Sequence, residues 1–170
     1  MNYRISRLNI LKIIENKYRR FLMSLGKEDI PKLEQFFRNY EDMKGQLLYR
    51  RYELLYKPQD TNTGGGKSNL PSSPVENEVT KLHSDLKYNN LQAIIQAIED
   101  VYNNATQEQK LIVDYRYWEK DLTIYEWPDI AHELTKARKD NKVISRDATL
   151  RMRNQLMRET AKRIGWVSFD

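Results

Sequence analysis

Few residues of this chain have the type and spacing that catalysis requires. The sequence contains no cysteine, which excludes disulfides, thiol chemistry and zinc–thiolate sites. The two histidines, His83 and His132, stand far apart, and the AHEL segment around His132 lacks the second histidine of a zinc-protease motif. No set of nucleophile, base and orienting group can be assembled around them. We therefore expect a protein that is not an enzyme, with no catalytic residue, metal or cofactor.

The segment TGGGKS ends like a phosphate-binding loop. Gly66, Lys67 and Ser68 match the last three positions of that motif, but position 61 is Thr where the motif requires Gly. The motif also needs a helix directly after it, and Pro71 follows instead. The surrounding residues, PQDTNTGGGKSNLPSS, are typical of an irregular linker. We expect a flexible linker over 58–73 and no nucleotide site.

Charge is distributed unevenly along the 170 residues. Residues 1–57 hold 13 basic and 7 acidic side chains, and residues 136–170 hold 10 and 4. Residues 58–135 hold 6 and 13, so two basic ends flank an acidic middle and the net charge is +5. Arginine and lysine bind phosphates, and arginine and asparagine can also read base edges in the major groove. We expect double-stranded DNA as a partner, although a basic surface helix without a ligand would have the same composition.

The last predicted helix supplies most of the candidate DNA contacts. It begins at the capping residue Ser145 and ends before Gly165. If Met152 lies at the centre of its buried face, a turn of 100° per residue places Ala148 and Leu156 on the same face. The other face and the preceding basic loop hold the predicted DNA-binding residues. In the helix these are Arg146, Asp147, Leu150, Arg151, Arg153, Asn154 and Arg158, and before it Lys136, Arg138, Lys139 and Lys142.

Apolar residues recur at intervals of three and four, and no segment alternates with a period of two, so the predicted fold class is all-α. The spacing predicts helices over 5–25 and 29–57, a helix from 74 to about 103 with a kink or a break at Asn89–Asn90, a helix from the Thr106 capping box to Trp118, and a short helix around 128–134. The predicted domains are a helical hairpin over 1–57, the linker over 58–73, a connecting helix or kinked helix pair over 74–105, and a helix-turn-helix domain over 106–170.

The apolar stripe from Leu33 to Leu55 is longer than one short neighbouring helix can cover. It therefore predicts a homodimer, unless the helix over 5–25 folds back onto it. The predicted dimer core consists of Phe36, Phe37, Tyr40, Leu47 and Tyr52.

Charged residues interrupt every apolar stretch near the N-terminus, MNYRISRLNILKIIENKYRRF. This pattern fits neither a secretory signal nor a membrane span. Together with the lack of cysteine, it predicts a cytoplasmic protein without a membrane partner.

Several segments resemble a known family. The linker PQDTNTGGG, the segment TQEQKLIVDYRYW and above all ISRDATLRMRNQLMRETAKRIG are similar to the RinA/ArpU group of phage late transcription regulators, whose C-terminal half resembles region four of sigma factors. The resemblance covers about residues 58–165. The residues in register with the basic and packing positions of the group are Ile144, Ser145, Arg151, Arg153, Leu156, Ala161 and Gly165. Ala148 stands where Thr is common, and the loop TKARKDNKV is longer than the tight turn of sigma-like domains.

The resemblance implies a sequence-specific activator of phage or prophage late genes that binds a promoter in a bacterial host and recruits the host RNA polymerase. It points to the segment from Leu111 to Trp118, with Asp114, Glu119 and Asp121, as the polymerase-contacting surface. Two other functions fit the same residues. A terminase small subunit would bind packaging-site DNA as a ring-shaped oligomer, and a helical adaptor would bind protein alone, without salt-dependent affinity for DNA.

Overall fold

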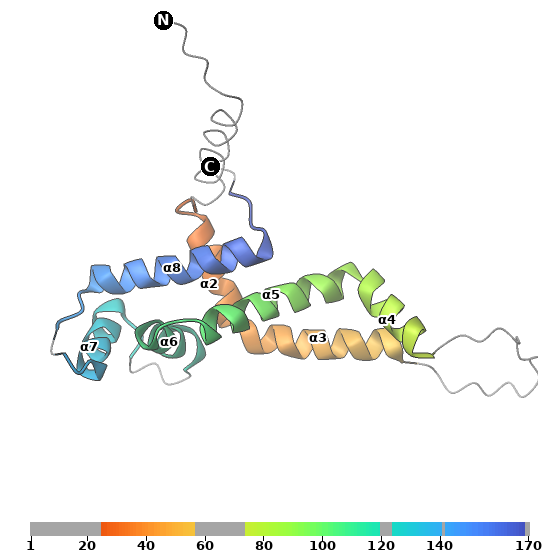
Figure 1. Cartoon of the computed structure of the whole chain (residues 1–170), viewed down its shortest axis with the longest axis horizontal. Helices are drawn as coiled ribbons and strands as arrows, with labels where there is room; N and C mark the ends of the chain where they lie inside the picture. Colours follow the sequence, from red (N-terminus) through yellow and green to blue (C-terminus); the bar gives the residue numbers. More distant parts are fainter. Residues whose placement is uncertain (1–24, 57–73, 120–123, 141, 169–170) are drawn as a thin grey trace, which may run out of the picture. The chain divides into compact units, whose positions relative to one another are not determined.

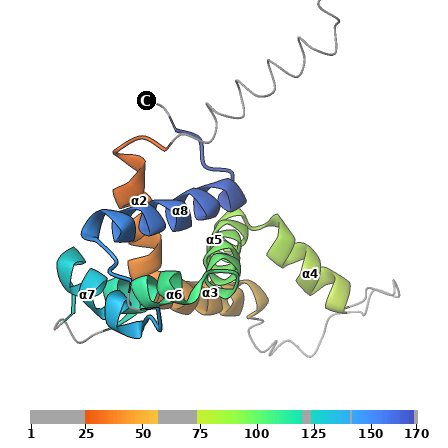
Figure 2. The same ribbon diagram turned by 60° about the vertical axis from the view of Figure 1, so that its left-hand side comes forward.

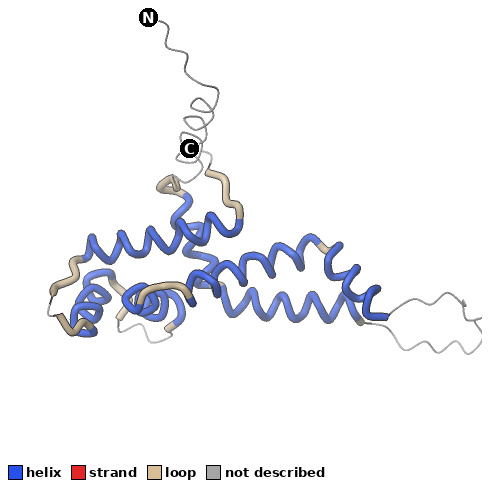
Figure 3. The backbone as a smooth tube through the Cα atoms, viewed as in Figure 1, coloured by secondary structure: helices blue, strands red, loops and turns tan. Residues whose placement is uncertain are grey.

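The computed structural model describes residues 25–56, 74–119, 124–140 and 142–168. These ranges contain helices and loops and no strand (Figure 1 and Figure 3), which confirms the all-α class. The described helices are α2 (Asp29–Arg38), α3 (Tyr40–Leu55), α4 (Pro74–Ser84), α5 (Leu86–Asn103), α6 (Gln107–Val113), the π-helical turn η1 (Asp114–Trp118), α7 (Trp127–Ala137) and α8 (Arg146–Ile164). None of them is long and apolar enough to cross a membrane. The helix predicted over 5–25, apart from Leu25, and the linker predicted over 58–73 lie outside the described residues.

The helix ends with local sequence signals are where the sequence predicts them. The Thr106 hydroxyl accepts the Gln109 backbone N–H at 3.3 Å, and the Gln109 side chain accepts the Thr106 N–H at 3.0 Å, which completes a capping box at the start of α6. Ser145 caps α8 by accepting the Ala148 N–H at 3.2 Å. Gly165 ends α8 in the left-handed conformation with φ of 68°, which a residue with a side chain rarely adopts.

Two predictions about helix continuity were wrong. The single helix expected over 29–57 is divided at Asn39, whose φ of −93° and ψ of 13° lie in the bridge region outside the helical well. The kink or break expected at Asn89–Asn90 is found instead at Asp85, where the chain breaks between α4 and α5. The Asp85 carboxylate accepts the Tyr88 backbone N–H at 2.7 Å and thereby caps α5. Both asparagines therefore lie inside a continuous helix.

The described chain forms two compact units, which differ from the predicted domains. Unit 1 combines residues up to Arg38 with residues from Ala97 onwards, and unit 2 consists of Asn39–Gln96. The sequence placed α2 in a separate N-terminal hairpin, but α2 packs on α8 and η1 of unit 1, as its crossing of α8 shows (Figure 2). The reason is hydrophobic: Leu33 and Phe37 of α2 are wholly buried.

The core of unit 1 joins residues that are distant in the sequence. The Phe37 ring packs on Tyr117 of η1 with their centroids 5.5 Å apart, and Phe36 lies edge-on to Trp166 at 6.2 Å. Asp29 accepts the Ser168 hydroxyl at 2.6 Å, and this hydrogen bond is the main reason that the pKa of Asp29 is lowered. The wholly buried large side chains of this unit are Leu33, Phe37, Ile98, Ile112, Val113, Ile130, Leu134, Thr149, Met157 and Thr160.

The turn η1 is the reason that two aromatic residues reach α2. The sequence predicts one regular helix as far as Trp118, but the Glu119 N–H donates to the Asp114 carbonyl, five residues back, at 2.7 Å. This wider turn accommodates an extra residue. As a result Tyr117 packs on Phe37, and the Trp118 indole N–H donates to the Phe37 carbonyl at 3.1 Å.

In unit 2, α3 packs against α4, and one arginine joins α3 to the start of α5. Arg50 donates to the Asp85 carboxylate through Nε at 3.2 Å and Nη2 at 2.6 Å, a bidentate pair. Its guanidinium lowers the pKa of Asp85. The carboxylate that caps α5 therefore also fixes α3 in this unit.

Candidate nucleic-acid interface

The connection between α7 and α8 is held by a partly buried threonine, Thr135, and by the residue before the α8 cap. The two helices pack on each other, and both contact α6. Thr135 of α7 donates its hydroxyl to the Ala131 carbonyl at 2.8 Å and accepts the Ile144 N–H at 2.9 Å. Ile144 is buried. The start of α8 is therefore anchored to α7 although the loop between them is long.

Within that loop, Arg138 and Asp140 form a bidentate pair. Nε and Nη2 of Arg138 donate to the Asp140 carboxylate at 2.7 and 2.5 Å, and the Lys142 backbone N–H donates to it at 3.2 Å. Arg138 also lies 3.8 Å from the carboxylate of Glu108. The Arg138 guanidinium, and to a lesser extent the Lys142 N–H, lower the pKa of Asp140 to about 2. The charge of Arg138, which the sequence assigned to DNA, is therefore largely neutralised within the protein.

This pair gives a testable pH dependence. Because the pKa of Asp140 is about 2 in the folded chain and 3.8 for an ordinary aspartate, the pair stabilises the fold above pH 4, and this contribution is lost as the pH falls through 2. In a carboxyl ¹³C NMR titration, Asp140 should have its midpoint near pH 2, and Arg138→Ala should move it towards 4. An Asp140 midpoint near 4 in the unaltered chain would show that the pair does not form in solution.

The other predicted loop cations differ in their surroundings. Lys136, in the last turn of α7, is ion-paired to Glu133 at 2.7 Å. Lys139 and Lys142 are exposed and make no ion pair with a described residue. Of the four predicted cations before α8, these two are therefore the ones whose charge is available to a polyanion.

The buried face of α8 is rotated from the one that the sequence predicts, although Leu156 is buried as expected. Met152 and Ala148, the expected centre and neighbour, are only partly buried. The buried positions are Thr149, Leu156, Met157, Thr160 and Ala161. Thr149 and Thr160 fit in the core because their hydroxyls donate to the Ser145 and Leu156 carbonyls at 3.2 and 3.0 Å. A prediction from apolar residues alone misses this face, because it does not count threonine as buried.

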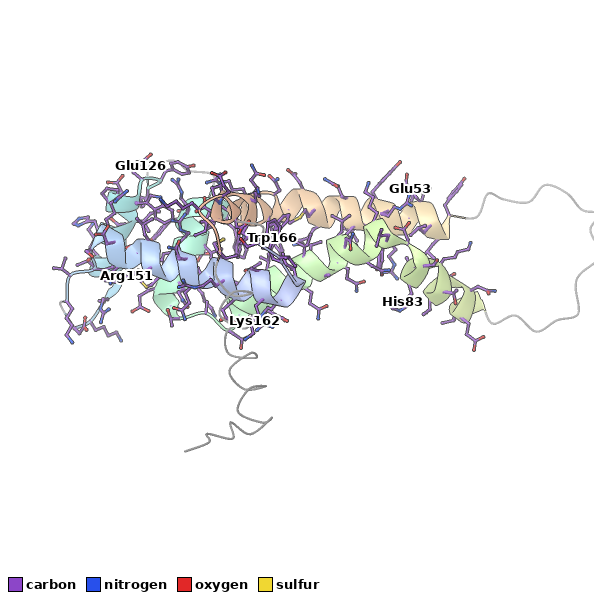
Figure 4. The ribbon with its side chains drawn as sticks, turned by 90° about the horizontal axis from the view of Figure 1, so that it is seen from above. Glu53, His83, Glu126, Arg151, Lys162 and Trp166 are labelled. Carbon is purple, nitrogen blue, oxygen red and sulfur yellow. The ribbon has the colours of Figure 1, made fainter. Side chains whose placement is uncertain are left out.

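The corrected face divides the predicted α8 contacts into two groups. The exposed group contains Arg146, Asp147, Arg151 and Arg158, and the partly buried group contains Leu150, Arg153 and Asn154. Gln155, which is not among the predicted contacts, is also exposed. Arg151 makes a backbone contact, from Nε to the Asp147 carbonyl at 3.3 Å, and its position on α8 is labelled in Figure 4. The ion pair between Arg146 and Asp147, at 3.6 Å, is well exposed and holds neither side chain firmly.

Arg153, which was predicted to flank the DNA-binding face, is instead engaged inside unit 1. Its Nη1 donates to Oε1 of Glu34 on α2 at 2.6 Å, and its side chain is only 17% exposed. Glu34, 9% exposed, also accepts the Tyr117 hydroxyl at 2.9 Å and lies 3.4 Å from Nη2 of Arg38. We call Glu34, Arg38, Tyr117 and Arg153 the Glu34 network. Burial and the nearby Glu34 carboxylate raise the pKa of Tyr117, so the phenol stays a hydrogen-bond donor.

One cation–π contact connects this network to the start of α7, and a second joins Arg116 to the same Trp127 ring. The guanidinium of Arg153 lies 5.3 Å from the centre of the Trp127 ring, and that of Arg116 lies 4.8 Å from the same ring. Arg116 also lies 3.7 Å from the centre of the Tyr125 ring and donates to the Tyr125 carbonyl at 2.6 Å. These contacts place α7 and α8 relative to each other through Trp127.

Of the three acidic residues expected to face a polymerase, the structure describes Asp114 and Glu119. Asp114 accepts the Tyr102 hydroxyl at 3.0 Å and so has a structural partner. Glu119 is exposed, and Asp121 lies outside the described residues. In the described ranges no three His, Cys, Asp or Glu side chains are grouped closely enough to hold a metal ion.

The predicted dimer core was wrong for the residues of α2. Phe37 is wholly buried in its own unit and Phe36 packs on Trp166, so neither can form the centre of an interface between copies. On α3, Tyr40 is 9% exposed, Leu47 is partly buried, and Tyr52 is 62% exposed. Of the five residues, Tyr52 alone has the exposure that a docking residue needs.

The described residues define a class: an all-helical protein of two compact units, one of which carries a basic helix with an exposed face. The chain belongs to the family described as "Protein of unknown function (DUF722)", whose model matches residues 30–162. No curated protein and no solved structure matches the chain significantly. The matched range includes most of α2 and most of α8, the two helices that Glu34 and Arg153 join.

Proposed function

We propose that the protein is a sequence-specific DNA-binding activator of phage or prophage late genes, in which α7 and α8 act as a helix-turn-helix and α8 enters the major groove. The observation that carries this proposal is the exposed face of α8. Arg151 and Arg158 on this face make no ion pair with a described residue, whereas Arg153 on the other face is neutralised by Glu34. A cationic face with unpaired arginines is suited to guanine edges and phosphates.

The loop before α8 supports the same function. Lys139 and Lys142 are exposed and unpaired in the described part of the chain, and they precede the capped start of α8. A helix start flanked by lysines favours a phosphate there, because the free N–H groups and the helix dipole attract anions. The bond between Thr135 and Ile144 fixes where that start lies relative to α7. With this anchor, α8 is positioned before DNA binds and loses little entropy on binding.

The transcriptional part of the proposal rests on the resemblance to the RinA/ArpU group. In this proposal the protein acts in the cytoplasm of the bacterial host, without a cofactor and without catalysis, by recruiting RNA polymerase. The exposed Glu119, with its sequence neighbours Asp114 and Asp121, is the proposed contact, since DNA would repel acidic side chains. A coupling of about 2 kcal/mol between activator and polymerase would raise promoter occupancy roughly 30-fold when the site is far from saturated.

DNA affinity of the full-length chain should fall steeply with salt. With about five phosphate contacts, the slope of log K against log salt should be about −4 to −5. Fluorescence anisotropy between about 50 and 200 mM salt measures this slope, and DNase footprinting of the late-operon region of the phage locates the site. A footprint upstream of a promoter supports the activator. A footprint at the packaging site by a ring-shaped oligomer would replace it with a terminase small subunit, and the absence of salt-dependent binding would exclude DNA binding.

A further inference from the structure

The second half of α3 presents apolar side chains that no described residue covers. Leu48 is 67% exposed, Tyr52 is 62% exposed and Tyr56 is 57% exposed, and these residues line a shallow groove with Arg51 and Leu55. Several large apolar side chains exposed together on one helix are unusual for a protein without a partner at that surface. This groove lies wholly on α3 and the residue after it, in unit 2. It is separate from the proposed DNA contacts.

The spacing of these residues fits packing against another helix. Gly45, Leu48, Tyr52 and Leu55 are separated by three, four and three residues, which is the spacing of the seam in a two-stranded coiled coil. We call these four residues the α3 seam. A side chain at Gly45 would meet nothing within 4 Å, so this position is an open notch on the helix. The notch allows a second helix to approach closely at one end of the seam.

We infer that the α3 seam is a dimer interface that binds the α3 seam of a second copy of this chain in parallel orientation. The argument for the partner is the charge beside the seam. Arg51 is exposed, and in the described part of the chain it makes no ion pair, whereas the neighbouring Arg50 is used by Asp85. Arg51 occupies a flanking position of the heptad, and Tyr56 occupies the opposite flank of the following heptad.

The parallel orientation of the two α3 helices is inferred from the side chains that parallel and antiparallel pairing would each place beside Arg51. In a parallel two-fold pair, each Arg51 lies beside Tyr56 of the other copy, where a guanidinium over a tyrosine ring is favourable. In an antiparallel pair, the flank that carries Lys44 and Arg51 would face itself, so four cations would meet along one side. Like charges at close range disfavour this arrangement. Each copy in a parallel pair would bring one DNA-binding unit, so this interface also suits a DNA site made of two half-sites.

The oligomeric state of the full-length chain tests the inference. Sedimentation equilibrium from about 1 to 100 μM should show an increase from the chain mass of 20.4 kDa to twice that mass. Leu48→Glu should raise the dissociation constant by about 30-fold or more, because the substitution places two charges at the centre of the seam. Leu86→Glu is the matched control: Leu86 is 74% exposed in the same unit but lies outside the seam, so this variant should dimerise normally. Circular dichroism shows whether both variants fold.

Single-cysteine crosslinking tests the orientation, since the natural chain contains no cysteine. In a parallel pair the two copies of Leu55 face each other, and Leu55→Cys should form a disulfide-linked dimer under mild oxidation. Lys81→Cys, on α4, should not. A wild-type chain that is monomeric at about 100 μM, or a dimer that Leu48→Glu leaves intact, would contradict the interface. A dimer in which Leu55→Cys fails to crosslink would contradict the parallel orientation. If the wild type is monomeric and Leu48→Glu makes residues 1–24 protease-sensitive, the occupant of the seam is the N-terminal segment of the same chain.

Discussion

Replacing Glu34 with alanine should lower the free energy of unfolding by about 3–5 kcal/mol, because the substitution leaves the buried guanidinium of Arg153 without its carboxylate. The Tyr117 hydroxyl would lose its acceptor at the same time. Urea denaturation followed by circular dichroism at pH 7 measures the change. The matched control is Glu41→Ala: Glu41 forms an ion pair with Lys44, but its side chain is 77% exposed, so the loss should be below about 1 kcal/mol.

A double variant separates the buried charge from general damage to the core. Glu34→Ala combined with Arg153→Met removes both charges of the pair and should recover a substantial part of the stability that Glu34→Ala loses. The expected coupling follows from the 2.6 Å contact between Nη1 and Oε1. If Glu34→Ala unfolds within about 1 kcal/mol of the wild type, Arg153 is not held by Glu34 and is free to contact DNA. That result would restore Arg153 to the DNA-binding residues.

Arg151→Ala should cost about 1–3 kcal/mol of binding free energy on the footprinted site, which is about 5- to 150-fold in affinity, and much less on random DNA. Arg151 is exposed on the outer face of α8 and is proposed to read a base edge. Lys139→Ala is the control, because a phosphate contact should weaken binding to both DNAs equally. Anisotropy with the two duplexes at one fixed salt concentration measures the difference. Equal losses for Arg151→Ala on both duplexes would mean that the base-reading face lies elsewhere on α8.

The parts of the fold that could be predicted are those that a few neighbouring residues determine. Thr106, Ser145 and Gly165 fix helix ends through contacts with residues no more than four positions away, so their roles can be read directly from the sequence. The division at Asn39 depends on distant packing as well. Leu33 and Phe37 belong to one unit and Asn39 begins the other, and periodicity alone contains no information about this division.

The face of α8 could not be predicted for a different reason. Thr149 and Thr160 are polar in composition but buried in fact, because each hydroxyl bonds to a carbonyl of its own helix. Arg153 is charged yet partly buried, because Glu34 comes from a helix 119 positions away in sequence. Assigning every polar residue of α8 to the exposed face therefore gave the wrong buried face. The one residue that could have indicated the error is Glu34, an acidic residue inside the apolar stripe of α2.

The division of unit 1 between two stretches of sequence affects how the protein is made. Residues 25–38 leave the ribosome long before residues 97–168, and all of unit 2 is synthesised between them. At about 5–20 residues per second, α2 waits on the order of 10 s for α8, with Leu33 and Phe37 uncovered. Unit 2 can fold during this interval, whereas the surface that is proposed to bind DNA forms only when translation reaches the end of α8. A nascent or truncated chain would thus expose its apolar α2 to chaperones and proteases before it could occupy a promoter.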